Sequence, residues 1–208
     1  MATETRHDSI RLFENDLLER LSHVHPITPL RFWGPVACWL LWHGVTAHDL
    51  GAGMVAALAL AGLFTWTFTE YLLHRFLFHF PARSRLGKWL VFLFHGNHHD
   101  DPKDKTRLVM PPAGAIPIMA LLYLLFNALL PAAWLHVFTA FFIAGYLVYD
   151  YIHYAVHHFP MNNRIARFLK HYHLKHHFSG QGGRFGVSSP LWDMVFGTRP
   201  AEISRDGR

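Results

Sequence analysis

The 208-residue sequence contains a single cysteine, Cys38. One thiol allows no intramolecular disulfide, no CxxC pair and no cage of thiolates around a metal. Any bound metal must therefore be held by nitrogen or oxygen ligands. Acidic residues are also scarce, because 14 Asp and Glu stand against 18 His. The abundant potential ligand in this chain is imidazole.

Charge is absent from four long apolar stretches, which contain no Asp, Glu, Lys or Arg. These stretches are Phe32 to His48, Gly51 to Thr69, Pro111 to Leu130 and Ala132 to Tyr149. Each approaches the length that a bilayer core of about 30 Å requires of a helix, although the first is marginal. Since 51% of all residues are hydrophobic, the chain is too apolar for an ordinary soluble domain. We therefore expect an all-α integral membrane protein with four transmembrane helices.

The breaks between these stretches predict the topology. Only a few residues separate the first from the second and the third from the fourth, so two antiparallel hairpins are expected. All 19 Lys and Arg fall outside the spans: four in residues 1–31, seven in 71–110 and eight after Asp150. Positive residues collect on the cytoplasmic side. We expect both termini there, together with a cytosolic helical cap, and the net charge of +5 then gives no reason to expect nucleic acid binding.

The N-terminal residues 1–30 differ in character from residues 31–208, which we expect to form the membrane domain. They lack the basic start and apolar run of a signal peptide, so the first spans are expected to target the chain. Apolar residues recur at helical spacing and predict a short amphipathic helix that ends near Pro26 and Pro29. These residues are Ile10, Phe13, Leu17, Leu18 and Leu21.

Ten histidines recur in spaced clusters next to the predicted spans. They are His74 and His79; His95, His98 and His99; His153 and His157; and His173, His176 and His177. On a helix, positions i and i+4 are about 40° apart, whereas i+3 lies about 60° to the other side, so one turn can offer ligands to two metals. The i, i+5 pair His74 and His79 would be about 140° apart, which predicts a kink or a helix end between them.

Ten imidazoles exceed the ligands that one ion uses, since zinc takes about four and octahedral iron about six. Two metals are therefore expected. Imidazole suits iron, zinc and copper, but dioxygen activation requires a redox-active metal such as iron. Carboxylates are expected to accept hydrogen bonds from the ligand N–H groups. The candidates are Glu70, Asp100, Asp101 and Asp150.

The remaining histidines do not follow this pattern. We expect most of them to be interfacial or core residues whose rings bond to carbonyls. These are His7, His23, His25, His43, His48 and His136, while His158 and His171 adjoin the clusters and stay unassigned.

Five segments resemble the fatty acid 2-hydroxylases, the branch of the fatty acid hydroxylase superfamily that acts on sphingolipid acyl chains. The resemblance extends from about Thr65 to Thr198 and includes the residues between the histidines. The segments are WTFTEYLLHRFLFH, FHGNHHDDPKDKTRLVMPP, YDYIHYAVH, YHLKHHF and FGVSSPLWDMVFGT.

The resemblance implies a four-helix membrane anchor beneath a cytosolic cap that holds a di-iron centre, which is sometimes isolated with zinc instead. It assigns all ten clustered histidines as metal ligands and places Tyr149 and Asp150 beside the metal cluster. We expect these two to be catalytic residues that contact the substrate head or the metal ligands. The implied reaction inserts one atom of dioxygen at the acyl carbon next to the carbonyl. Its two electrons come from NAD(P)H through a separate carrier such as cytochrome b5 or a ferredoxin.

The chain departs from many members of this family at its N-terminus, where roughly 30 residues are too few for the fused cytochrome b5 domain. The substrate therefore stays open between a ceramide, a free fatty acid, an acyl thioester and another membrane lipid. Sterol or carotenoid hydroxylases and desaturases share the same centre and are the nearest alternatives. A membrane metal-binding or transport protein is the non-enzymatic alternative, and it would place ligands along the spans.

Overall fold

The computed structural model describes residues 9–201, and every regular element within them is a helix. The elements are α1 (Asp16–Ser22), α2 (Thr28–His48), α3 (Ala52–Leu72), the π-helix η1 (Leu73–Phe78), α4 (Arg85–Val91), the π-helix η2 (Phe92–Gly96), α5 (Asn97–Asp100), α6 (Pro112–Leu129), α7 (Ala132–His158), α8 (Arg164–Phe178) and α9 (Leu191–Val195). The predicted all-α class is confirmed.

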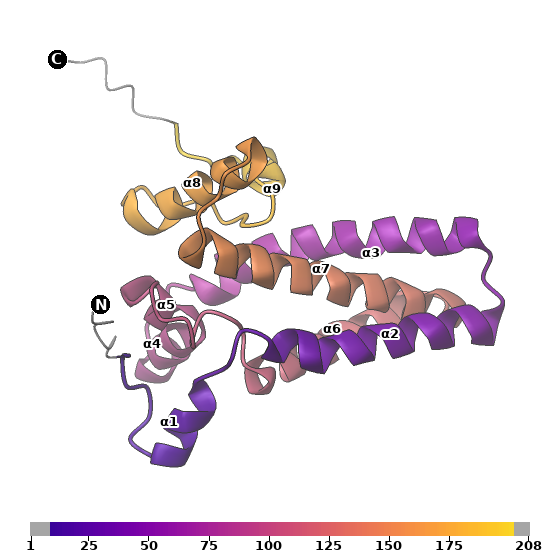
Figure 1. Cartoon of the computed structure of the whole chain (residues 1–208), viewed down its shortest axis with the longest axis horizontal. Helices are drawn as coiled ribbons and strands as arrows, with labels where there is room; N and C mark the ends of the chain where they lie inside the picture. Colours follow the sequence, from indigo (N-terminus) through magenta and orange to yellow (C-terminus); the bar gives the residue numbers. More distant parts are fainter. Residues whose placement is uncertain (1–8, 202–208) are drawn as a thin grey trace, which may run out of the picture.

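Four long helices run along the molecule, and the short helices gather at one end of it (Figure 1). The long helices are α2, α3, α6 and α7. The chain turns sharply between α2 and α3 at Asp49, which adopts a left-handed conformation with φ of 47°. However, α7 lies between α2 and α3 and makes extensive contacts with both. The first predicted hairpin is therefore splayed around α7.

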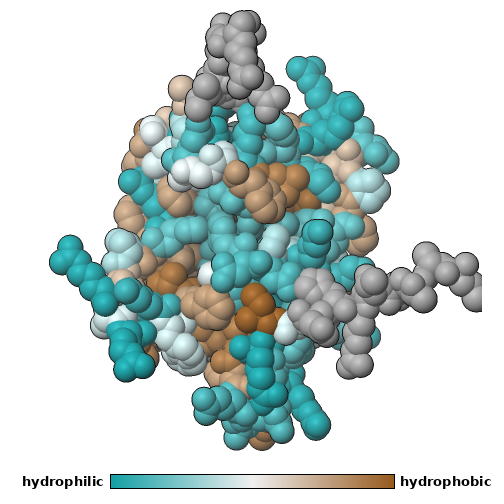
Figure 2. Space-filling model, turned by 90° about the vertical axis from the view of Figure 1, so that its left-hand side faces the viewer, coloured by the Kyte–Doolittle hydropathy of each residue, from teal (hydrophilic) through white to brown (hydrophobic). Residues whose placement is uncertain are grey.

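Three segments are long and apolar enough to cross a membrane. They are Ala52–Phe78, which combines α3 and η1, Pro112–Leu129, which is α6, and Ala132–His158, which is α7. The other predicted span, Phe32 to His48, lies inside the 21-residue helix α2. The end of the molecule that lies opposite the α2–α3 turn has a largely hydrophilic surface (Figure 2).

Helix α7 is the core of the bundle, and glycines let its neighbours approach it closely. A Cβ at Gly62 of α3 would lie 2.5 Å from the Phe138 carbonyl oxygen, and one at Gly145 of α7 would lie 2.6 Å from the Trp66 Cβ. Small residues at a helix interface bring two backbones together and increase their van der Waals contact. The aromatic rings of Trp66, Phe142 and Tyr146 then fill the space beside this contact.

The N-terminal helix is shorter than its apolar spacing predicts. It begins at Asp16, where the Asn15 side chain accepts hydrogen bonds from the Leu17 and Leu18 backbone N–H groups. Ile10 and Phe13 therefore precede the helix. The carboxylate of Glu19 in α1 pairs with Arg107, whose side chain is buried. This ion pair attaches the N-terminal segment to the loop before α6.

The close approach of α3 and α7 generates a first prediction. Gly62→Ala should lower the free energy of unfolding by about 1–3 kcal/mol, because the added methyl group meets α7 backbone and the helices must separate. The check is the thermal unfolding midpoint in detergent, followed by circular dichroism. Gly53→Ala on the same helix is the matched control, since a Cβ there meets nothing within 4 Å. Equal midpoints for the two variants would contradict this account of the packing.

Candidate metal centre

A π-helical turn brings His74 and His79 together. Helix α3 continues into η1, where hydrogen bonds join residues i and i+5, and the His79 N–H donates to the His74 carbonyl at 3.1 Å. π-Helical turns of this kind are frequent at functional sites. The two rings, which a regular α-helix would point apart, have centroids 5.0 Å apart. The predicted distortion between them is this π-helix, which ends at Phe78, the residue before His79.

A second π-helix places the next cluster. His95 lies in η2, and His98 and His99 lie in the following short helix α5. The Asn97 side-chain N–H group donates to the carbonyls of Phe92 and Leu93 at 2.9 and 2.8 Å. It thereby satisfies carbonyl groups of the distorted helix and fixes the turn that carries the three histidines.

Helices α7 and α8 provide the other five histidines. His153 and His157 lie one turn apart near the end of α7. Helix α8 begins at Arg164, where the Asn163 side chain accepts from the Ala166 N–H at 2.8 Å. Its last turns carry His173, His176 and His177.

The ten histidines converge into two groups of five. The first group is His74, His79, His95, His99 and His176; the second group is His98, His153, His157, His173 and His177. Within each group, the candidate ligand atoms all lie within 4.8 Å of one another. The groups are adjacent, since the rings of His99 and His177 stack with centroids 4.1 Å apart. As the spacing predicts, α5 and α8 each contribute to both groups.

The spacing of the Nε2 atoms fits a metal ion. Along the first group the separations are His74–His95 3.0 Å, His95–His99 3.1 Å, His99–His176 3.2 Å and His176–His79 3.0 Å. Along the second they are His153–His98 3.0 Å, His98–His177 3.1 Å, His177–His173 3.0 Å and His173–His157 2.9 Å. Ligands at right angles are separated by √2 times the metal–ligand distance, so 3.0 Å corresponds to about 2.1 Å, a normal zinc–imidazole distance.

Backbone carbonyls orient at least two of these rings. His74 Nδ1–H donates to the Phe185 carbonyl at 2.5 Å, and His176 Nδ1–H donates to the Gly183 carbonyl at 2.7 Å. A proton on Nδ1 leaves the Nε2 lone pair free for a metal. The expected carboxylate acceptors are therefore wrong for these two rings.

Buried carboxylates act one step further out, by holding the loop that supplies the carbonyls. Glu70 accepts from the backbone N–H groups of Val187 and Ser188 at 2.6 and 2.8 Å and also from the Ser188 hydroxyl. Asp193, which is fully buried, accepts from the N–H groups of Phe185 and Gly186 at 2.9 and 2.7 Å. No spacing in the sequence points to Asp193, because it lies outside every histidine cluster along the chain.

Partial burial keeps even the less buried imidazoles of the centre neutral. The pKa of His79 is lowered to about 4 by burial and by the adjacent His176. Burial, followed by the neighbouring His176, His79 and His157, lowers the pKa of His99 to about 3. A neutral imidazole is the form that binds a metal. The groups therefore keep their ligand form well below neutral pH.

An apolar cavity of about 490 Å³ reaches both groups. Its wall includes His95 of the first group and His153 of the second, together with Tyr149 and Asp150. Tyr149 stacks on His153 with ring centroids 5.9 Å apart. The Met110 backbone N–H donates to the Asp150 carboxylate, whose Oδ2 has no partner within residues 9–201. The two residues singled out beside the fourth span thus line the space next to the histidines.

The other histidines of the described chain lie outside the two groups. His43 and His136 pack against each other between α2 and α7, with ring centroids 4.8 Å apart, and His158 packs on Tyr154. His23 bonds to Thr106 at the N-terminal attachment. His7 lies outside the described residues.

Comparisons with known proteins agree with this geometry. Residues 59–198 match the sequence model described as fatty acid hydroxylase. The chain is 37% identical to a dihydroceramide fatty acyl 2-hydroxylase of Arabidopsis thaliana, over 91% of this chain and 80% of that protein. It is 35% identical to the fatty acid 2-hydroxylase of Homo sapiens, over 93% of this chain and 57% of that protein.

A solved structure also matches the fold. Full-length Scs7p, in which only the hydroxylase domain is visible, has a TM-score of 0.85 and 38% identity, and the match covers 91% of this chain and 71% of that one. The family model covers more than half of the chain and includes all ten clustered histidines. The chain belongs to the fatty acid hydroxylase family.

Proposed function

We propose that this chain uses dioxygen to hydroxylate a lipid acyl chain at carbon 2, on a free fatty acid or an N-acyl sphingolipid. The observation that carries the proposal is one apolar cavity whose wall includes His95 of the first five-histidine group and His153 of the second. The relatives described above are named for 2-hydroxylation of fatty acids and dihydroceramide. The names of these relatives support the reaction, and the apolar cavity supports a lipid as its substrate.

Each histidine group would hold one iron ion, and the pair would supply the activation of dioxygen. The protein's part is to hold the ligands. Because the Nδ1 protons of His74 and His176 are engaged by carbonyls, each of these rings presents Nε2. Five neutral donors per ion leave room in an octahedral shell for another ligand. The site is therefore suited to a metal that must also contact a reactant.

The cavity would bind the acyl chain and leave its polar end beside the histidines. Apolar side chains such as Phe94, Met119 and Leu122 make up most of its lining, and they suit an alkyl chain. The polar groups Tyr149 and Asp150 lie at the histidine end. We assign to them the contacts with the acyl carbonyl or head group, which would place carbon 2 next to the metal pair. An apolar enclosure also excludes water from the reaction.

The membrane arrangement belongs to the same proposal. We infer that α2 is a fourth span, since it packs along α7 beside the three apolar segments. The clustered Lys and Arg would place both termini, the metal centre and the hydrophilic end in the cytoplasm. Residues 1–30 would be a segment attached to a membrane domain of residues 31–208. Electrons from NAD(P)H would arrive there through a separate carrier such as cytochrome b5 or a ferredoxin.

The proposed reaction predicts one labelled oxygen atom in the product. Cells that express the chain under ¹⁸O₂ should contain lipids with one ¹⁸O on the carbon next to the acyl carbonyl, as determined by fragmentation in mass spectrometry. His98→Ala and His176→Ala should abolish this product, because each removes a ligand from one group. A folded, metal-loaded protein that yields no oxidised lipid when supplied with an electron donor would exclude the proposed function.

The division of the histidines predicts the metal content. The wild-type protein should contain two metal ions per chain. His95→Ala/His99→Ala should retain only the ion of the second group, and His173→Ala/His177→Ala only that of the first, because each pair removes two of five ligands. Elemental analysis of purified protein measures the content. His136→Ala, outside both groups, is the control and should keep two ions. Loss of both ions from each double variant would contradict the prediction that each group binds its ion independently.

The lowered histidine pKa values predict a stability loss in acid for the protein stripped of metal. Above pH 6.5 the folded and unfolded states both hold neutral imidazoles, so these residues have no effect. Below it, the unfolded chain takes up protons that folded His79 and His99 resist down to pH values of about 4 and 3, and stability falls as the pH falls. Thermal midpoints between pH 7.5 and 4.5 should record this decline. His79→Gln/His99→Gln should show a shallower slope, and a parallel slope would contradict the assignment.

A further inference from the structure

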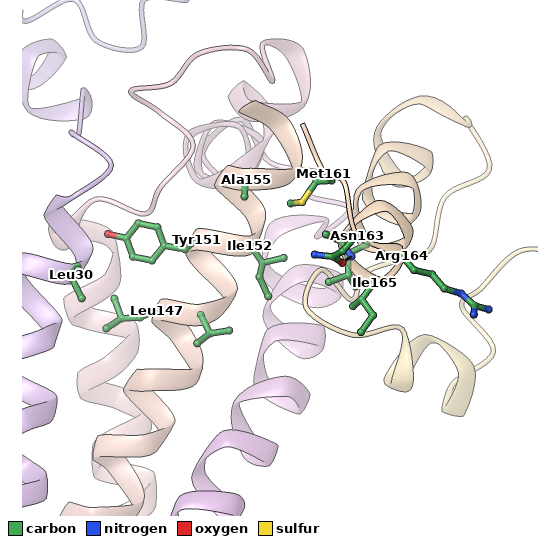
Figure 3. Close-up of a pocket in the computed structure, with 12 residues that line it drawn as sticks. Leu30, Leu147, Tyr151, Ile152, Ala155, Met161, Asn163, Arg164 and Ile165 are labelled. Carbon is green, nitrogen blue, oxygen red and sulfur yellow. Dashed lines mark hydrogen bonds between the residues drawn. The ribbon is translucent and has the colours of Figure 1, made fainter. Parts of the chain in front are cut away.

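A second hollow lies on the face of α7 that is turned away from the metal centre. It is an open groove of about 870 Å³, and α7 forms its floor between Leu30 of α2 and the first turn of α8 (Figure 3). The groove shares no lining residue with the cavity at the histidines. It is therefore a separate binding surface.

Helical geometry explains why α7 serves both hollows. Val148 in the groove and Asp150 in the cavity are two positions apart, as are Ala155 in the groove and His153 in the cavity. Positions two apart on a helix point about 160° apart. The groove thus lies directly behind the residues that line the metal-centre cavity.

The groove floor is apolar and continuous with a membrane-spanning surface. Val148 is 54% exposed and lies within the apolar segment Ala132–His158. The Tyr151 hydroxyl donates its hydrogen bond to the Pro26 carbonyl at 2.9 Å, so it has no proton left to donate to an occupant of the groove. The Asn163 side chain caps α8. What remains for an occupant is a surface suited to an alkyl chain.

Among the described residues that line the groove, Arg164 is the one charged residue. Arg164 extends outward from the start of α8, away from α7 (Figure 3), and it has no ion pair within residues 9–201. Helix α8 contains four Lys and Arg and no Asp or Glu. Its first turn also carries the positive end of the helix dipole. An anionic group is therefore favoured at this point.

We propose that the groove binds a membrane phospholipid with an anionic head group. One acyl chain lies along Val148, Ile152 and Ile165, and the phosphate lies at Arg164. Ile165 is 73% exposed, so a bound acyl chain would cover the apolar side chain of Ile165. The floor of the groove belongs to the apolar segment Ala132–His158, so a soluble protein partner would have to displace the bilayer from it. A lipid is therefore favoured over a protein as the occupant. The site is independent of the proposed oxidation.

The test is native mass spectrometry of the whole protein with phosphatidylglycerol or phosphatidylcholine of identical acyl chains. The wild-type protein should retain phosphatidylglycerol preferentially. Arg164→Glu should weaken retention by at least about fivefold, the contribution of one basic residue near an anionic lipid. Ile165→Asp should weaken retention of both lipids. The matched control is Arg167→Glu, an exposed residue of the same helix that does not line the groove.

Metal content identifies any variant that fails to fold, and the thermal midpoint with added phosphatidylglycerol gives a second measure of binding. Equal retention of the two lipids, or equal retention by Arg164→Glu and Arg167→Glu, would overturn the anionic head group. Retention unaffected by Ile165→Asp would overturn the groove, as would a protein dimer in place of lipid adducts. Because no turnover is measured, failure of the proposed hydroxylation would leave these outcomes interpretable.

Discussion

The crowding of imidazole nitrogens is the constraint on which the rest of the structure depends. Neighbouring Nε2 atoms in the two groups lie 2.9–3.2 Å apart, and wherever two of them face each other as lone pairs they repel. Protonation would relieve some of this repulsion, but burial opposes the charged form. A cation shared by each group would satisfy the lone pairs without a buried proton, and metal binding would then be coupled to the folding of this end. The helices that carry the ligands must therefore meet at one point.

The fold meets this requirement with the central helix α7 and the two π-helices η1 and η2. Helix α7 is packed on both sides, and Gly62 and Gly145 bring α3 against it until no Cβ fits at the contact. Helix α3 continues from this contact into the π-helix η1, which brings the rings of His74 and His79 together. The Glu70 carboxylate in the last turn of α3 holds the loop at Val187, so packing in the bundle also orders the carbonyls around the ligands.

Much of this arrangement could be predicted from local spacing. The four apolar stretches and the ten clustered histidines depend on neighbours within a few residues, and the i, i+3 and i, i+4 intervals predicted that one turn serves two groups. The membership of each group could not be predicted, because it depends on how α5 meets α8. The backbone carbonyls that accept hydrogen bonds from His74 and His176 could not be predicted either, because a carbonyl has no sequence signature. The role of Asp193 could not be predicted either, because its partners are the backbone N–H groups of Phe185 and Gly186, and a backbone N–H has no sequence signature.

The position of the histidine groups at the end of an apolar helix follows from α7. One face of this helix carries Asp150, His153 and His157, and the opposite face is apolar and open along Val148. A lipid substrate that enters the histidine cavity thus exchanges one apolar environment for another, and only its polar end must be desolvated beside Tyr149 and Asp150. In the proposed function, binding would then be selective at the head of the acyl chain, where a polar group can be recognised. A carbon next to that head group is the one that such a site can hold in a fixed position, which is the physical basis for oxidation at carbon 2.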